Sequence, residues 1–143
     1  GFVMAIAATK SGLDVLMAKT LIAPFGKKSE NVLLGFMLIT GIFSMFISNT
    51  ATAALLIPIL SVVCAGMGDK LAEIGGTSTI LIGVAVAASC AMSLPISTPP
   101  NAIAYSTGLI QQTDMVKAGA SIGVISILIG YSVLVFFCRM GIL

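Results

Sequence analysis

The sequence contains no histidine and no tryptophan, and only 8% of its residues are charged. Soluble globular domains carry about 25% charged residues, so this chain lacks the polar surface that water requires. Its net charge of +2 is too small to indicate a nucleic-acid partner. The cysteines, Cys64, Cys90 and Cys138, lie singly in apolar stretches, which favours packing over metal binding or a disulfide. No nucleophile with a base and no metal cluster is apparent, so we do not expect an enzyme.

The residues that are present are mostly apolar: 58% are hydrophobic, and the mean hydropathy is +1.16. The few charges leave three uncharged windows, residues 31–68, 74–113 and 118–138. A helix needs about 20 apolar residues to cross a bilayer, so the last window fits one span and each of the others fits two passes. The sequence therefore predicts an all-α integral membrane protein with the lipid bilayer as its surroundings.

The beginning of the chain carries no targeting signal. It starts at Gly1 without a basic segment or a cleavage site, and we interpret it as part of a longer protein without a signal peptide. Four or five membrane segments would suit one half of an internal repeat. Basic residues flank nearly every window, so the positive-inside rule does not fix the orientation.

We divide the chain into four segments. Residues 1–26 are expected to contain a helix over 1–20 that spans the membrane only partly or follows the interface. Residues 27–73 are expected to form a re-entrant hairpin and residues 74–113 a broken helix. Residues 114–143 form the final transmembrane helix, and a polar surface loop is expected at 111–117. Within the first segment, Lys10, Asp14 and Lys19 form a polar stripe.

Helix length points to two breaks inside the membrane. A helix over residues 32–47 would be about 24 Å long, and one over 80–94 about 22 Å before Pro95 interrupts it. Neither crosses about 30 Å of hydrocarbon plus headgroups, so both should stop near the bilayer centre. Each stops at a polar stretch, residues 48–52 and 97–101. Irregular backbone at that depth requires protein or a water-filled cavity around it, and we prefer a hairpin to two full spans over residues 31–68.

The polar stretches contain residues typical of helix starts. Thr98 stands at an N-cap position and Pro99 at the first helical position, and Ser48, Asn49 and Thr50 precede the other outgoing helix. Two helix N-termini at one depth suit an anion with two negative ends, and the carbonyls that end the incoming helices suit a cation. The first two windows hold no Asp, Glu, Lys, Arg or His for a proton relay, so sodium bound by neutral oxygens fits best, by analogy with other broken-helix transporters.

Two stretches carry a resemblance to a known family. Ser48-Asn49-Thr50 within ISNTATAALLIPI, and LPISTPPNAIAYSTG from Leu94, resemble the paired signatures of the divalent anion:sodium symporter family. The resemblance covers nearly the whole chain and is closer to the C-terminal of the family's two inverted repeats. It implies a re-entrant hairpin with SNT at its tip, a broken helix with a proline-rich loop, a second repeat that completes the site, and a homodimer that works by an elevator-like movement.

The resemblance also implies roles for individual residues. Substrate would be bound by Ser48, Asn49, Thr50, Thr98 and Pro99. Sodium would be bound by Ser44, Asn49, Ser97 and the backbone near Ile47. The family usually has Ala or Gly at the position of Ser97, so its contribution would be a carbonyl or an additional hydroxyl. No cofactor beyond the coupling ion is expected.

The function that follows is secondary active transport: sodium-coupled symport of a small dicarboxylate, tricarboxylate or sulfate, in what we expect to be a bacterial inner (cytoplasmic) membrane. Polar residues in membrane helices often only bond to neighbouring helices, but the pairing of SNT with STPPN favours a site. Two alternatives stay open: a related exporter or antiporter of the same broad fold, and a channel whose breaks form the filter.

Overall fold

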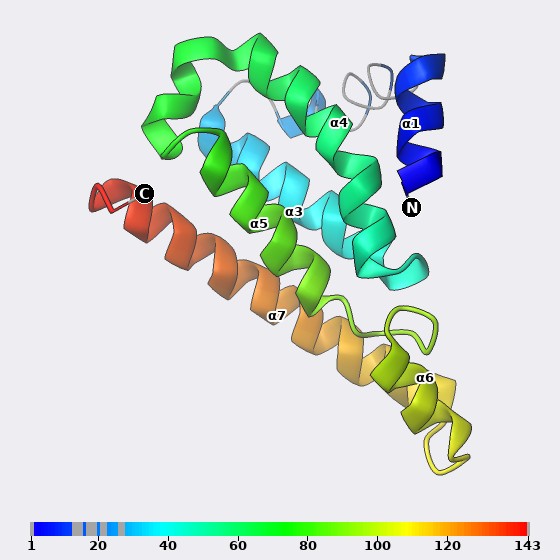
Figure 1. Ribbon diagram of the computed structural model, residues 1–143. Helices are drawn as coiled ribbons and strands as arrows, with labels where there is room; N and C mark the ends of the chain where they lie inside the picture. The colour runs from blue at the N-terminus through cyan, green and yellow to red at the C-terminus, as the bar shows by residue number, and fades with distance from the viewer. Residues whose placement is uncertain (1, 13–15, 17–19, 21–22, 26–27, 143) are drawn as a thin grey trace.

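The computed structural model of the chain describes residues 2–12, 16, 20, 23–25 and 28–142. Throughout this part of the chain the regular structure is helical, which confirms the all-α prediction. In chain order the elements are α1 (Phe2–Ser11), η2 (Ala23–Phe25), α3 (Ser29–Phe46), α4 (Asn49–Met67), η3 (Gly68–Ile74), α5 (Thr77–Cys90), α6 (Pro99–Ser106) and α7 (Gln112–Arg139). Figure 1 shows α3, α5 and α7 as neighbouring rods, with α6 below them near one end of α7.

Among the described residues, three helical stretches are long and apolar enough to cross a membrane. These are α3, the continuous stretch Asn49–Ile74 formed by α4 and η3, and α7, whereas α5 is an apolar helix of shorter length. Only 17% of the apolar 18-residue window of α7 is buried inside the chain. A helix that is hydrophobic on its outward faces is stable where lipid or more protein covers it. These helices agree with the prediction of an integral membrane protein.

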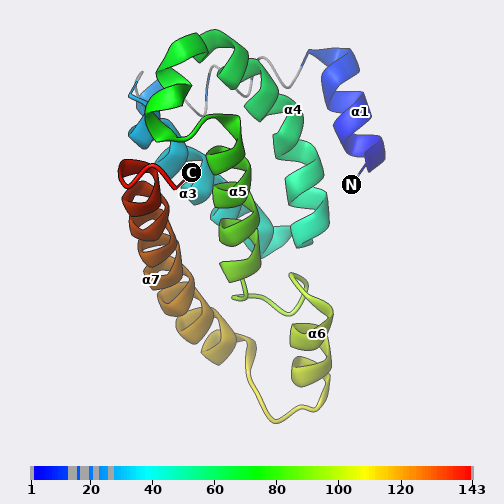
Figure 2. The same ribbon diagram turned by 60° about the vertical axis from the view of Figure 1, so that its left-hand side comes forward.

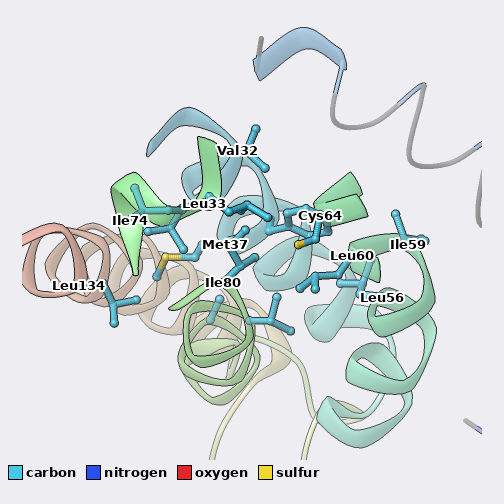
Figure 3. Close-up of a cluster of buried hydrophobic side chains, with 14 of the residues drawn as sticks. Val32, Leu33, Met37, Leu56, Ile59, Leu60, Cys64, Ile74, Ile80 and Leu134 are labelled. Carbon is cyan, nitrogen blue, oxygen red and sulfur yellow. The ribbon is translucent and has the colours of Figure 1, made fainter. Parts of the chain in front are cut away.

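The interior of the bundle lies where α3, α4 and α5 meet. Leu33 and Met37 of α3 and Ile80 of α5 are completely buried, and Leu56 and Leu60 of α4 are 1% exposed. Figure 3 shows these side chains pointing toward one another from the three helices. Burying a side chain of this size stabilises a fold by about 1.5–3 kcal/mol in water, whereas in lipid the gain comes mainly from close packing.

Glycines bring the helices of the bundle into close contact. A Cβ on Gly83 of α5 would lie 2.7 Å from Leu33 Cδ1, and one on Gly41 of α3 would lie 2.5 Å from Ile127 Cδ1 of α7. α3 is therefore in van der Waals contact with both α5 and α7. α1 packs against α4 on the other side, while α6 has no buried residue (Figure 2).

After the first break the chain runs back, so that η3 lies beside the start of α3. The hydroxyl of Ser29, at the start of α3, donates to the carbonyl of Lys70 in η3 at 2.5 Å. The two ends of the segment predicted as a hairpin thus lie together. α3 is longer than predicted, however, because Ser29 and Glu30 already belong to it. Its 18 residues measure about 27 Å, so length alone no longer distinguishes a re-entrant hairpin from two full spans.

Helix boundaries near both ends of the chain differ from the prediction. α1 ends at Ser11, where Gly12 takes a left-handed φ of 71° that interrupts a helix, and most of the predicted continuation to residue 20 lies outside the described residues. The proposed stripe residues Asp14 and Lys19 lie outside the described residues. The segment predicted as a polar surface loop at 111–117 belongs mostly to α7, which begins at Gln112. Asp114 in the first turn interacts favourably with the helix dipole, so a polar sequence here begins the helix.

The second break also begins earlier than predicted. α5 ends at Cys90, and Ala91 leaves the helical conformation with φ −85° and ψ 79°. Proline excludes the helix before its own position, because its ring clashes with the carbonyl four residues back and restricts the preceding residue. For Pro95 those residues are Ala91 and Leu94. Pro95 therefore accounts for the break, but it lies inside the loop rather than at the end of the helix.

Candidate functional site

The first break separates α3 from α4 by two residues. Ile47 is extended, with φ −125° and ψ 154°, and its N–H still donates to the carbonyl of Phe43 at 3.0 Å. Ser48 is the N-cap of α4, and its Oγ accepts from the N–H of Ala51 at 3.3 Å. Asn49 and Thr50, expected just before the helix, form its first turn. The tip of the break is thus the capped N-terminus of a long helix, which favours an anion.

A buried hydroxyl connects the two sides of this break. Ser44 in the last turn of α3 is completely buried, and its Oγ lies 2.6 Å from Asn49 Oδ1 and 3.2 Å from the carbonyl oxygen of Ala88. The Ser44 hydroxyl has one proton, but two acceptor oxygens lie within its reach. It can donate fully to only one of them, so the other oxygen receives no full hydrogen bond from Ser44. A small hard cation is bound by oxygens of this kind. Sodium, a small cation that binds oxygen, fits this cluster of one hydroxyl, one amide oxygen and one carbonyl.

Ala88 is a component that sequence reasoning missed. It contributes through its backbone, so its residue type carries no signal for ligand binding. The available signal was its position in the last turn of a helix that precedes a break, where its carbonyl keeps only a long bond, 3.4 Å from the N–H of Ala91. Through Ala88 and Ser44, the carbonyl end of α5 lies beside the end of α3, and the two breaks meet at one level of the bundle.

The second break is a loop from Ala91 to Thr98 that leads into α6. Thr98 is extended and caps α6, with Oγ1 accepting from the N–H of Asn101 at 3.4 Å, and Pro99 is the first helical residue. Ser97 is 2% exposed, and its Oγ donates to the carbonyl of Leu94 at 2.7 Å. The hydroxyl of Ser97 is therefore engaged within the loop, which leaves its backbone carbonyl as the oxygen available to an ion.

Asn101 holds this loop together. Its Nδ2 donates to the carbonyl of Met92 at 2.9 Å, to the carbonyl of Leu94 at 3.2 Å and to Ser97 Oγ at 3.2 Å. Sequence reasoning noted Asn101 as part of the STPPN stretch but gave it no role. An amide just after two prolines was the available signal, since it supplies two donors where the proline nitrogens supply none.

The predicted residues are brought together only in part. Ser44 and Asn49 are in direct contact, and Ser44 also touches the end of α5. Within the part of the chain that the structure describes, no hydrogen bond joins Ser48 or Thr50 to Thr98. The two helix ends that were predicted to bind the anion are separate surfaces here, and the contact of Ser44 with Ala88 joins the first break to the end of α5.

Two buried hydroxyls near the breaks have no partner. Among the described residues, Thr52 Oγ1 and Ser93 Oγ are the buried side-chain oxygens or nitrogens without a hydrogen bond. Thr52 lies one turn beyond Asn49 in α4, and Ser93 lies in the second break. An unsatisfied buried polar group costs about 1–3 kcal/mol, so a group that the described chain does not satisfy lies in or beside each break. Thr52 ends the polar stretch at residues 48–52 but was given no role there, and Ser93 was not singled out, because a single Ser in an apolar segment carries no specific signal.

Charged groups are found away from the oxygen cluster. Glu30 at the start of α3 pairs with Arg139 at the end of α7, with Oε1 and Nη2 3.0 Å apart at an exposed position. Both lie at the end of α3 opposite to Ser44. Within the described ranges no group of His, Cys, Asp or Glu side chains is arranged to bind a metal ion. The groups described above at the two breaks are neutral ones: hydroxyls, amides, backbone carbonyls and helix ends.

The chain is similar in sequence to known transporters. A family model described as citrate transporter (CitMHS) matches residues 1–142. An uncharacterized transporter of Methanocaldococcus jannaschii is 36% identical over 82% of this chain and 25% of its own length. Human solute carrier family 13 member 4 is 33% identical over 90% of this chain and 20% of its own. The sodium-dependent dicarboxylate transporter SdcS of Staphylococcus saprophyticus is 34% identical over 64% of this chain and 17% of its own.

The chain spans a quarter or less of the length of these relatives. The family and the relatives are transporters and not enzymes, and the relatives with a named ion are sodium-dependent. Breaks with capped helix ends, a neutral oxygen cluster and apolar helices are all features expected of such proteins. The chain belongs to the citrate transporter family, and its resemblance to the divalent anion:sodium symporters is confirmed.

Proposed function

We propose that the protein carrying this chain is a sodium-coupled symporter of a small divalent or trivalent organic anion. The observation that carries the proposal is the contact of Ser44 Oγ with both Asn49 Oδ1 and the carbonyl of Ala88. It gathers neutral oxygens from both breaks beside the capped N-terminus of α4. A cation at the oxygens and an anion at the helix end would attract each other, which is a physical basis for coupling.

We assign the sodium ion to the oxygens of Ser44 and Asn49 with the backbone carbonyls of Ile47 and Ser97. Support comes from the complete burial of Ser44 and from the engagement of the Ser97 hydroxyl within its own loop. The carbonyl of Ala88 lies within reach of the same position. One hydroxyl oxygen, one amide oxygen and several backbone carbonyls form a ligand set that suits a hard monovalent ion better than a proton.

We assign the anion to Ser48, Asn49 and Thr50 at the start of α4 and to Thr98 and Pro99 at the start of α6. In both helices a side-chain hydroxyl caps the first turn, so the free N–H groups and the positive dipole end point out of the helix. Ser48, Thr50 and Pro99 are exposed in this chain. They are therefore open to a substrate that the remaining protein would enclose.

The substrate class follows from the relatives rather than from the site. The matching family is described as citrate transporter, and relatives are named for sodium-dependent dicarboxylate transport. We therefore rank dicarboxylates and citrate ahead of sulfate. Helix N-termini bind any of these anions without a specific side chain.

We further propose the architecture in which this site works. Residues 27–73 form the re-entrant hairpin, residues 74–113 the broken helix and residues 114–143 the final span of the C-terminal repeat. The other repeat of the same protein completes the site, and the transporter is a homodimer with elevator-like alternating access, in a bacterial inner membrane. The return of η3 to the start of α3 and the meeting of the two breaks are compatible with this arrangement.

Uptake into proteoliposomes tests the coupling. The full-length protein should accumulate radiolabelled succinate or citrate when sodium is high outside, and should not when potassium or choline replaces sodium. Uptake that is independent of sodium but driven by a proton or by internal anion would support the exporter or antiporter alternative. Currents at channel rates that do not saturate with substrate would instead indicate a channel.

A further inference from the structure

Gly119 lies in the second turn of α7, outside both breaks. Its backbone touches the backbone of the second break directly. A Cβ on Gly119 would lie 2.5 Å from Ser93 Cα, 2.9 Å from the carbonyl oxygen of Met92 and 3.0 Å from the nitrogen of Ser93. Real Cβ atoms do not approach other atoms below about 3.0 Å. Any side chain at this position therefore requires the backbone at residues 92–93 to move.

The carbonyl that Gly119 touches belongs to the hydrogen bonds that organise the loop. Met92 O accepts from Asn101 Nδ2 at 2.9 Å, and the same amide holds Leu94 O and Ser97 Oγ. The N–H of Asn101 is in turn the group that Thr98 Oγ1 caps at the start of α6. A displacement at Met92 is thus transmitted through one side chain to the N-terminus of α6.

We infer that Gly119 is a positioning residue for the second break. Because Gly119 has no side chain, α7 packs directly against the Met92 carbonyl and keeps it where Asn101 Nδ2 donates to it, and this bond holds the STPPN loop in place. The inference rests on the proposed function, because it assigns the substrate-facing end of α6 to that loop. It adds a residue from a different helix, which neither binds substrate nor belongs to either polar motif.

The other glycines of α7 provide a graded comparison. A Cβ on Gly123 would lie 3.3 Å from the carbonyl of Cys90, a milder contact with the backbone at the end of α5. A Cβ on Gly130 would meet side-chain atoms, Val86 Cγ1 at 3.0 Å and Met37 Cε at 3.5 Å. Side-chain ends can turn aside, whereas a backbone in a tight loop cannot. Alanine at 119, 123 and 130 should therefore disturb the loop in decreasing order.

Transport kinetics of the full-length protein in proteoliposomes provide the first test, with radiolabelled succinate or citrate as the probe, whichever the wild type takes up. Gly119→Ala should raise the substrate KM by about fivefold or more, the change expected when one hydrogen bond is lost. Vmax per folded transporter should change much less, since a defect of packing alone would lower the folded amount and not KM. Gly123→Ala should show a smaller rise, and Gly130→Ala should match the wild type in KM.

A double-mutant cycle then tests the route through Asn101. If Gly119 acts by supporting the carbonyl that Asn101 holds, then Gly119→Ala in an Asn101→Ala background should raise KM far less than in the wild type. Independent, multiplicative effects of the two substitutions would overturn the inference. So would a Gly119→Ala protein that matches Gly130→Ala.

A labelling measurement separates this inference from the proposed function. Ile96 in the loop is 70% exposed, and Ile96→Cys, in a background where Cys64, Cys90 and Cys138 are replaced, reports the loop directly through its rate of reaction with a thiol reagent. The rate should change with Gly119→Ala and not with Gly130→Ala, even if no anion is transported. Absence of wild-type uptake would refute the symport proposal, and an unchanged labelling rate would refute the role of Gly119. If Gly119→Ala does not fold, Gly123→Ala takes its place with a smaller expected change, because the carbonyl of Cys90, which a Cβ on Gly123 would meet, accepts from the N–H of Met92 at 3.1 Å. An unchanged labelling rate in Gly123→Ala would then refute the support of the loop by α7.

Discussion

The hydroxyl of Ser44 lies 2.6 Å from Asn49 Oδ1, although one belongs to the helix that enters the first break and the other to the helix that leaves it. Ile47 between them is extended and Ser48 leaves the helical conformation with φ −59° and ψ 148°, which allows the last turn of α3 to face the first turn of α4. The same hydroxyl reaches the carbonyl of Ala88 in α5. Ser44 is therefore the point at which three helix ends meet, and its chemistry is the most direct test of the site.

Ser44→Ala should weaken sodium binding with little direct effect on the anion. The change removes one oxygen ligand and the group that orients Asn49. We expect the sodium concentration for half-maximal uptake to rise about tenfold, equivalent to about 1.4 kcal/mol, while uptake at saturating sodium is largely kept. Ser61→Ala is the matched control, because Ser61 is exposed on α4 and its hydroxyl only bonds to the carbonyl of Ile57. An unchanged sodium dependence would remove Ser44 from the ion site.

Asn49 and Thr50 should differ in what they affect. Asn49 lies in contact with Ser44 and also stands in the first turn of α4, so Asn49→Ala should lower the affinity for both sodium and substrate. Thr50 is exposed at the same helix end, and Thr50→Ala should mainly raise the substrate KM. Uptake measured against sodium concentration at saturating substrate, and against substrate concentration at saturating sodium, separates the two affinities. Wild-type uptake by Asn49→Ala would contradict the proposed site.

Thr52 and Thr40 form a matched pair for stability. Both are completely buried, but Thr52 Oγ1 has no partner, whereas Thr40 Oγ1 donates to the carbonyl of Phe36 at 2.6 Å. Thr52→Val should stabilise the sodium-free protein by about 1–3 kcal/mol, because it removes an unsatisfied polar atom at nearly constant volume. Thr40→Val should be neutral or destabilising. Thermal unfolding of the purified protein without sodium measures both, and a lower midpoint for Thr52→Val would show that its hydroxyl is satisfied within the full-length protein.

The depth of Phe46 distinguishes a hairpin from two full spans. Phe46 is the last residue of α3 and is 64% exposed. A spin label at Phe46→Cys should lie about 20 Å from the headgroup surface if the hairpin turns near the bilayer centre. Lys28→Cys, just before α3, provides the surface reference on the side where the hairpin begins. A label at the opposite headgroup level would show that α3 crosses the whole membrane.

The sequence alone was sufficient for the membrane character and for the presence of two polar breaks between apolar helices. These depend on composition and local order, because lipid requires long uncharged stretches and each break carries its own capping residues. Thr98 as an N-cap and Pro99 as the first helical residue needed no tertiary information, since proline fixes the backbone locally. The helix ends were less predictable: α5 stops well before Pro95, since proline acts on the residues that precede it.

Only the tertiary structure showed that the Ser44 hydroxyl reaches the carbonyl of Ala88, that Asn101 donates to the carbonyls of its own loop, and that Gly119 lies against the backbone of residues 92–93. The acceptors are backbone carbonyls and Gly119 has no side chain, so the residue types at Ala88, Met92 and Gly119 carry almost no trace of these contacts. They arise because packing and the fold of the loop bring a helix end, a side chain or another helix against backbone that is not adjacent in sequence. Local sequence thus determined where the helices break, and helix packing decided which atoms meet at the breaks.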